Sequence, residues 1–137
     1  MKPEAAAFLE KSREFLAKAD GMLANQWPDE AGRAAYLAGF HAAQALIFEK
    51  QGRAVKSHSG VQAQFARLVK DDPHFDIEQR RFLGRAYNLK ALVDYETGPG
   101  AHITEAQAIE AIRMAERFVA AVAELMPEDE VVPPAPN

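Results

Sequence analysis

Apolar residues recur every three or four positions along most of this chain, the spacing that places them on one face of an α-helix. Runs that alternate apolar and polar residues, which are typical of strands, are absent from the sequence. In the first segment two apolar stripes run side by side, one with Phe8, Phe15, Ala19 and Met22 and the other with Leu9, Leu16 and Leu23. The pattern predicts an all-α protein whose first helix covers roughly residues 4–24.

Prolines, a glycine and capping residues divide the rest of the chain into further helices. The second helix is predicted from Pro28 to about residue 51, and it is apolar or small on almost every side, as expected of a central helix with several neighbours. A short third helix begins near Ser59, a fourth follows Asp76, and a fifth starts at Thr104 in the capping-box sequence TEAQ. This order predicts an antiparallel four-helix up-and-down bundle with one additional short helix.

Length and composition indicate one domain of ordinary globular type. The chain has 137 residues, of which 48% are hydrophobic and 26% charged. We predict a helical domain over residues 1–126 and, in PEDEVVPPAPN, a disordered C-terminal tail over 127–137. No apolar run reaches the roughly 18 residues that a membrane helix needs, and the N-terminus is charged rather than signal-like. We therefore expect a cytoplasmic protein that makes no membrane contact.

Cysteine usage and charge narrow the chemistry. The chain has no cysteine, which excludes disulfides, thiolate catalysis and cysteine-based metal sites. No two histidines stand at metal-ligand spacing on one helix, and we expect neither a metal nor a cofactor. The formal net charge of -4 disfavours nonspecific attraction to nucleic acid, so any RNA binding would depend on a local basic patch.

The segment KSHSGVQAQF (56–65) places a histidine and two serines directly before a helical run. Ser59 and Gln62 have the spacing of a capping box, in which the serine hydroxyl accepts a hydrogen bond from the backbone N–H three residues later. In this interpretation His58 stands beside a helix cap and has no further role.

The same segment is also a candidate anion site. Backbone N–H groups at a helix start, here those of Gly60 and Val61, attract negative charge. Lys56, His58 and Arg53 stand nearby in the sequence. A phosphate or another anion is the ligand expected in such a pocket, and this interpretation is compatible with a helix cap.

Two polar residues interrupt the apolar second helix. His41 and Gln44 are three positions apart and share one side of it. A buried polar group without a partner costs on the order of 1–3 kcal/mol, so each needs a hydrogen bond. They either find structural partners nearby or belong to a site.

The fourth helix carries most of the remaining charge near its middle. Lys90 and Asp94 are four positions apart and can form an ion pair along the helix surface. Arg80, Arg81 and Arg85 form a basic cluster that is either a solvated face or a ligand patch.

Three segments stand in a recognisable order, namely AAYLAGFHAAQALIFEKQG (34–52), KSHSGVQAQF (56–65) and LKALVDYE (89–96). Together they resemble the HEPN domain, the "higher eukaryotes and prokaryotes nucleotide-binding" family, and most of all its small stand-alone prokaryotic branch. The pattern there is an aromatic-rich FHAA helix, a K[ST]HSG loop and an RxxADY helix. The resemblance spans residues 5–126.

The resemblance assigns family positions to single residues of this chain. The FHAA histidine falls on His41, the HSG histidine on His58, and the DY pair on Asp94 and Tyr95. Lys90 stands where the pattern has arginine, so a forked guanidinium contact would become a point charge.

The resemblance also implies partners and an activity. Small members of the family are usually homodimers, and many act with a minimal nucleotidyltransferase as toxin–antitoxin or nucleotide-handling pairs. Several branches are metal-independent ribonucleases that use an arginine followed, after four to six residues, by a histidine. RAVKSH (53–58) and RLVKDDPH (67–74) have this spacing but lie outside the fourth helix, where no histidine follows an arginine in that way.

We therefore expect a homodimeric HEPN protein that binds a nucleotide or RNA and partners a minimal nucleotidyltransferase. One alternative is a metal-independent ribonuclease with Arg53 and His58 as its catalytic candidates, and another is a noncatalytic oligomerisation module. In the absence of the arginine–histidine pair on the fourth helix, we expect little RNA cleavage by the protein alone. The ligand-binding candidates are His41, Gln44, Lys56, His58, Ser59, Gly60, Lys90, Asp94 and Tyr95.

Overall fold

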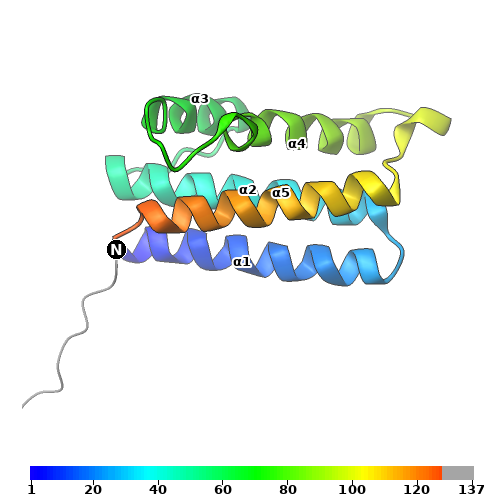
Figure 1. The fold of residues 1–137 in the computed structure, drawn as a ribbon, viewed down its shortest axis with the longest axis horizontal. Coiled ribbons are helices and arrows are strands. Elements are labelled where there is room, and N and C mark those ends of the chain that lie inside the picture. Colours follow the sequence, from blue (N-terminus) through cyan, green and yellow to red (C-terminus); the bar gives the residue numbers. More distant parts are fainter. Residues whose placement is uncertain (128–137) are drawn as a thin grey trace, which may run out of the picture.

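The computed structural model describes residues 1–127, and all of its regular structure in that range is helical. Successive long helices run in alternating directions, and one shorter helix lies among them (Figure 1). The elements are α1 (Pro3–Ala24), α2 (Pro28–Gln51), the shorter α3 (His58–Leu68), α4 (Ile77–Tyr95), the 3-10 turn η1 (Pro99–Ala101) and α5 (Glu105–Leu125). The predicted antiparallel four-helix bundle with one additional short helix is confirmed.

The predicted domain boundary and tail are only partly within the described range. Residues 128–137, which make up all but the first residue of the predicted tail, lie outside it. No helix within residues 1–127 combines the length and the apolar character needed to cross a membrane.

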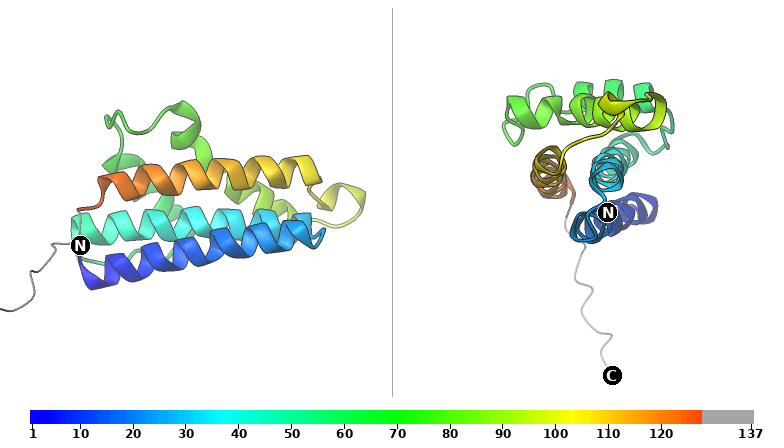
Figure 2. Two further views of the ribbon diagram at one scale, coloured as in Figure 1. Left: turned by 60° about the horizontal axis from the view of Figure 1, so that its bottom comes forward. Right: turned by 90° about the vertical axis from the view of Figure 1, so that its right-hand side faces the viewer.

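Helix α2 is the centre of the bundle and packs against each of the other four α-helices. Seen along the bundle, α3 and α4 form a layer on one side of α2, and α1 lies on the opposite side (Figure 2). Most of the buried positions of α2 are alanine or glycine, so the backbones of neighbouring helices can approach closely. At Gly39 a Cβ atom would stand only 2.3 Å from the ring of Phe82 in α4.

Two helix starts follow the sequence prediction. Asp76 caps α4 and Thr104 caps α5, and each forms a full capping box with the glutamine three residues later. Helix α2 ends at Gln51, and its C-cap is Gly52. The positive φ of Gly52, 72°, is the left-handed conformation that glycine adopts without strain.

The cap of α3 differs from the prediction. The helix begins one residue earlier than expected, and its cap is Ser57, whose hydroxyl accepts a hydrogen bond from the N–H of Gly60 at 3.0 Å. The predicted capping box between Ser59 and Gln62 is therefore wrong. The two serines are both suitable N-cap residues, and only the backbone conformation decides which one stands outside the helix.

Candidate functional site

His58 is the first residue of α3, and its imidazole packs in the corner where α2, α3 and α4 meet. The Nδ1 atom lies 2.6 Å from the hydroxyl of Tyr36 in α2. Three aromatic rings surround the imidazole, those of Tyr36, Phe40 and Tyr87, at centroid distances of 5.6, 5.1 and 5.3 Å. The histidine as a whole is half-buried.

The surroundings of His58 favour a neutral imidazole. Burial lowers its pKa below the ordinary value, and the positive charge of Lys90 lowers it further. Burial and the neighbouring Tyr87 raise the pKa of Tyr36 to about 12, so the Tyr36 hydroxyl keeps its proton. If the Tyr36 O–H group donates to Nδ1, the ring proton of the neutral imidazole stands on Nε2. The contact with Tyr36 thus fixes the orientation of the His58 ring.

The start of α3 offers fewer free donors than the sequence suggests. The N–H of Gly60 donates to the Ser57 hydroxyl, and the N–H of Val61 donates to the Ser57 carbonyl oxygen at 2.9 Å. The expectation that these two groups would be open to an anion is therefore wrong. Lys56 and Ser59 are exposed on either side of His58 and keep their side chains at the surface.

His41 and Gln44 satisfy each other and a backbone carbonyl. His41 Nδ1 lies 2.7 Å from Gln44 Oε1, and Gln44 Nε2 donates to the carbonyl oxygen of Val55 at 2.8 Å. The His41 ring stacks on Phe15 of α1 with centroids 5.4 Å apart. Burial lowers the pKa of His41, although its hydrogen bond to Gln44 opposes the shift. His41 thus faces α1, with the ring of Phe40 between it and His58.

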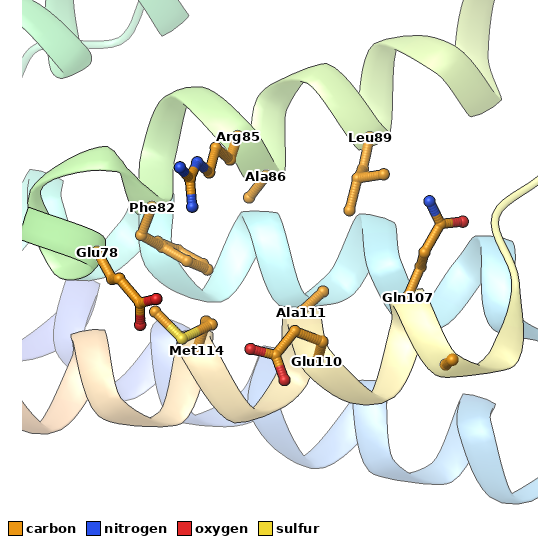
Figure 3. A pocket seen from close by; sticks show the side chains of 10 residues that line it. Glu78, Phe82, Arg85, Ala86, Leu89, Gln107, Glu110, Ala111 and Met114 are labelled. Atoms are coloured by element: carbon orange, nitrogen blue, oxygen red, sulfur yellow. The ribbon is translucent and has the colours of Figure 1, made fainter.

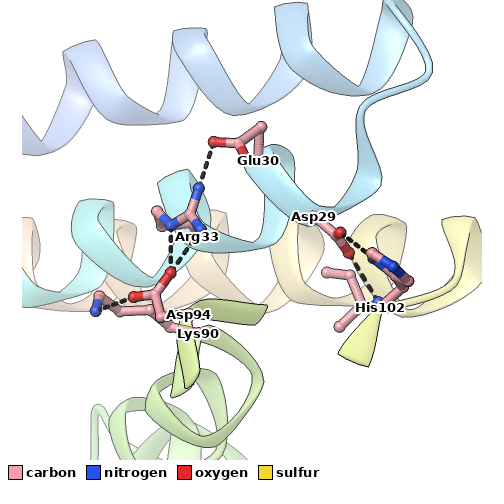
Figure 4. Close-up of polar contacts among 7 residues, drawn as sticks. Asp29, Glu30, Arg33, Lys90, Asp94 and His102 are labelled. Carbon is pink, nitrogen blue, oxygen red and sulfur yellow. Dashed lines mark hydrogen bonds and ion pairs between the residues drawn. The ribbon is translucent and has the colours of Figure 1, made fainter. Parts of the chain in front are cut away.

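Lys90 and Asp94 form the expected ion pair along α4, at 2.5 Å, and a third residue joins them. Arg33 of α2 donates from Nε to the Asp94 carboxylate at 2.8 Å and also pairs with Glu30 (Figure 4). The side chains of Lys90 and Asp94 are only 13% and 19% exposed, so the pair is more enclosed than an isolated surface pair. The pKa of Asp94 is lowered, because the hydrogen bonds and charges of Lys90 and Arg33 outweigh the upward effect of burial.

A second polar contact lies at the same end of α2. Asp29 accepts a hydrogen bond from the backbone N–H of Ile103 at 2.9 Å, and its other oxygen lies 2.6 Å from Nδ1 of His102 (Figure 4). The His102 side chain is 71% exposed. This contact fastens the turn before α5 and involves none of the predicted site residues.

The other candidates are exposed. Arg53 lies in the connection between α2 and α3, and Tyr95 is 72% exposed at the end of α4. The ammonium of Lys90 stands 5.9 Å from the centre of the Tyr95 ring. The predicted residues therefore form three separate groups, around His58, around His41 and around Asp94, rather than one hydrogen-bonded network.

An open groove of about 470 Å³ lies between α3 and α4, beside His58, and is called the α3–α4 groove below. Its polar lining consists of Gln62, Asn88, Tyr87 and the three arginines 80, 81 and 85. Among residues 1–127, no carboxylate lines it. Tyr87 and Gln62 form the side nearest the site, since Tyr87 packs on His58 and Gln62 lies near enough to Tyr36 to influence the pKa of its hydroxyl.

A second hollow, of about 380 Å³, lies between α4 and α5. Its walls are mainly apolar, with Phe82 and Leu89 from α4 and Met114 from α5. Three charged residues also line it, namely Glu78, Glu110 and Arg85, and Arg85 lines the α3–α4 groove as well (Figure 3). It lies on the side of α4 that faces α5, whereas His58 contacts the side that faces α2 and α3.

Sequence reasoning missed Tyr36, Tyr87 and Arg33, which hold the site together. Arg33, Tyr36 and Phe40 stand three and four positions apart, and so share one face of α2. On α4, Tyr87 precedes Lys90 by three residues and shares its face in the same way. This helical spacing is the feature of the sequence that could have identified the three residues.

Among residues 1–127, no three histidine or carboxylate side chains are grouped as metal ligands.

The chain matches known proteins over most of its length. The model of the HEPN domain matches residues 5–125. A Methanocaldococcus jannaschii protein named "Putative toxin MJ0605" is 31% identical over 119 residues, which cover 87% of this chain and 86% of that protein. "Putative toxin MJ0142" of the same organism is 27% identical over 95 residues, 69% of this chain and 64% of its own length.

A solved structure has the same fold. The crystal structure of TT1696 from Thermus thermophilus superposes with a TM-score of 0.76 and 25% sequence identity, over 91% of this chain and 100% of that one.

Proposed function

This chain belongs to the HEPN domain family, and on that basis we propose that it is the toxin-type member of a toxin–antitoxin pair and binds a nucleotide or an RNA end at His58. The names of the two Methanocaldococcus relatives support the toxin role. The observation that carries the binding role is the 2.6 Å contact between Tyr36 and His58.

That contact orients the imidazole before a ligand binds. With Nδ1 occupied by Tyr36, the imidazole has a fixed orientation beside the Tyr87 ring, and in the tautomer with the proton on Nε2 it offers an N–H donor. A nucleotide supplies an acceptor oxygen for such a donor and a base for stacking on an aromatic ring. Lys56, which is exposed two residues before His58, adds positive charge at the same place.

The partner we propose is a minimal nucleotidyltransferase, as the family resemblance implies. Co-expression of the two proteins with a tag on one of them tests this pairing. Co-elution through size exclusion as one complex is the expected result, and separate elution of two folded proteins would contradict it.

We also propose that the protein is a homodimer. Four large apolar side chains of the described range stay exposed in the single chain, those of Trp27, Ile77, Tyr95 and Ile109. Sedimentation velocity at micromolar concentration should give the mass of two chains. A single species of 15.1 kDa would contradict the dimer.

Ribonuclease activity is the second candidate. A histidine whose pKa is lowered is a suitable general base near neutral pH. Its candidate arginine, Arg53, is exposed in the loop before α3. In this alternative the active pair would combine His58 with Arg53 of a second copy of the chain.

One binding experiment tests the proposed site. Fluorescence anisotropy of a labelled single-stranded RNA with a 5′-phosphate gives Kd for the wild type, for His58→Ala and for His102→Ala as a matched control. We expect His58→Ala to weaken binding about tenfold or more, which corresponds to about 1.4 kcal/mol, and His102→Ala to leave Kd unchanged. Equal Kd values for all three proteins would contradict the proposed site.

The same samples separate binding from cleavage. With EDTA present, the RNA should stay intact during the titration. Rapid cleavage by the wild type that is lost in His58→Ala would replace the binding role by the ribonuclease alternative.

A further inference from the structure

The charged residues that line the α3–α4 groove, within the described part of the chain, are all positive. Three arginines line it and no carboxylate does, although the chain as a whole carries a formal charge of -4. A concave surface lined by one sign of charge concentrates the electric field and attracts ions of the opposite sign. The groove therefore favours an anionic ligand.

The three arginines have different roles. Arg80 is half-buried and its guanidinium donates to backbone carbonyls at the end of α3 and in the loop that follows, among them Lys70 at 2.8 Å and Asp72 at 2.6 Å. These bonds use its donors to hold the loop in place. Arg81 and Arg85 are exposed and form no hydrogen bond or ion pair with any residue of the range 1–127. Their donors are therefore available to a ligand, and Arg85, which also lines the hollow between α4 and α5, stands at the border of the groove.

We propose that the α3–α4 groove binds the sugar–phosphate backbone of a single RNA strand, with Arg81 and Arg85 on two neighbouring phosphates. This inference rests on the proposed function and specifies its ligand as a strand rather than a mononucleotide. Arg81 and Arg85 are four residues apart on α4, so their Cβ atoms lie about 6 Å apart. Successive phosphates of an extended strand are separated by a similar distance. Each guanidinium group can therefore bind its own phosphate through two parallel hydrogen bonds.

The groove leads to the proposed site through Tyr87. The Tyr87 ring lines the groove and packs on the His58 ring at 5.3 Å. A base that stacks on Tyr87 would therefore lie beside the imidazole, and the next phosphates would lie along α4 toward the arginines. Asn88 and Gln62 line the same groove and offer amide groups to sugar hydroxyls.

Gly84 keeps the groove open between the two arginines. A Cβ atom built on it meets no heavy atom within 4 Å, so a side chain at this position would enter free space. Position 84 is therefore a place where a charge can be introduced without disturbing the packing of the bundle.

The salt dependence of RNA binding tests this proposal. For single strands the slope of log K against log salt concentration is about -0.7 for each phosphate that the protein neutralises. We expect Arg81→Gln and Arg85→Gln each to make the slope less steep by about 0.7. Arg13→Gln, which removes the same charge from α1 on the far side of α2, should leave the slope unchanged.

Two further variants test the groove without removing an arginine. Gly84→Glu should weaken RNA binding strongly, whereas Gly84→Gln, of the same size but uncharged, should have a much smaller effect. Adenosine 5′-monophosphate should bind far more weakly than the strand, and equal affinity for both ligands would overturn the choice of a strand.

The outcomes separate the two proposals. RNA binding that depends on His58 but keeps its full salt slope in Arg81→Gln and Arg85→Gln would overturn the groove and leave the proposed function intact. A wild-type protein that binds no RNA would overturn both.

Discussion

The hydroxyl of Tyr36 lies 2.6 Å from Nδ1 of His58, and this contact joins the middle of α2 to the first residue of α3. Tyr36 is fully buried in the central helix, so its hydroxyl has a fixed position. His58 is half-buried and reaches the surface. The contact with the buried Tyr36 therefore holds the imidazole in a fixed position, where a ligand can reach it.

Removal of the Tyr36 hydroxyl should destabilise the fold. Tyr36→Phe leaves His58 Nδ1 without its hydrogen-bond partner, which should lower the free energy of unfolding by about 1 kcal/mol. Urea denaturation measures the change. Tyr95→Phe, at a side chain that is 72% exposed, is the control and should change the free energy by less than about 0.5 kcal/mol. Equal losses in the two variants would contradict this role of the hydroxyl.

The pKa of His58 should be measurably low. Burial and the charge of Lys90 both disfavour the imidazolium, so the pKa in the folded protein should lie below the ordinary 6.5. An NMR titration of the histidine side chains measures it. Because Lys90→Gln removes a positive charge, it should raise the pKa of His58 toward 6.5. A pKa at or above 6.5 in the wild type would show that the imidazolium is favoured instead.

The cap of α3 gives a direct comparison between two serines. Ser57→Ala removes the acceptor of the Gly60 N–H and should lower the free energy of unfolding by about 1 kcal/mol. Ser59→Ala, two residues later on the exposed side of the helix, should change it by less than about 0.5 kcal/mol. Thermal or urea unfolding of the two variants decides between them, and the reverse order would restore Ser59 as the cap.

Two glycines should respond in opposite ways to alanine. Gly84→Ala places a methyl group in open space within a helix and should raise the free energy of unfolding by up to about 1 kcal/mol. Gly39→Ala places its Cβ 2.3 Å from the buried Phe82 ring and should lower it, by roughly 1–3 kcal/mol. Urea denaturation of both variants provides the test, and stabilisation by Gly39→Ala would mean that α2 and α4 can move apart.

The helices could be predicted from the sequence because each one follows from local patterns. The apolar spacing, Pro28 at the start of α2 and the capping boxes at Asp76 and Thr104 all act within one or two turns. The small, apolar composition of α2 also identified the central helix.

The site could be predicted only in part, because its contacts join distant positions. The pair of Lys90 and Asp94 lies within one helix and follows from spacing. The contacts of Tyr36 with His58 and of Arg33 with Asp94 join different helices, and they depend on how those helices rotate against one another. Local spacing does not reveal that rotation, so the sequence alone does not show that His41 faces α1 while His58 packs against α2 and α4.

The central claim is that His58 contacts a nucleotide or an RNA strand, and the histidine side-chain NMR spectrum tests it most directly. The chain has four histidines, so their ring signals can be followed separately as unlabelled single-stranded RNA is added. We expect the His58 signals to shift and saturate with the same Kd as the anisotropy titration. His74 and His102, which are exposed at other places, should not move. RNA binding that leaves the His58 signals unchanged would contradict the account.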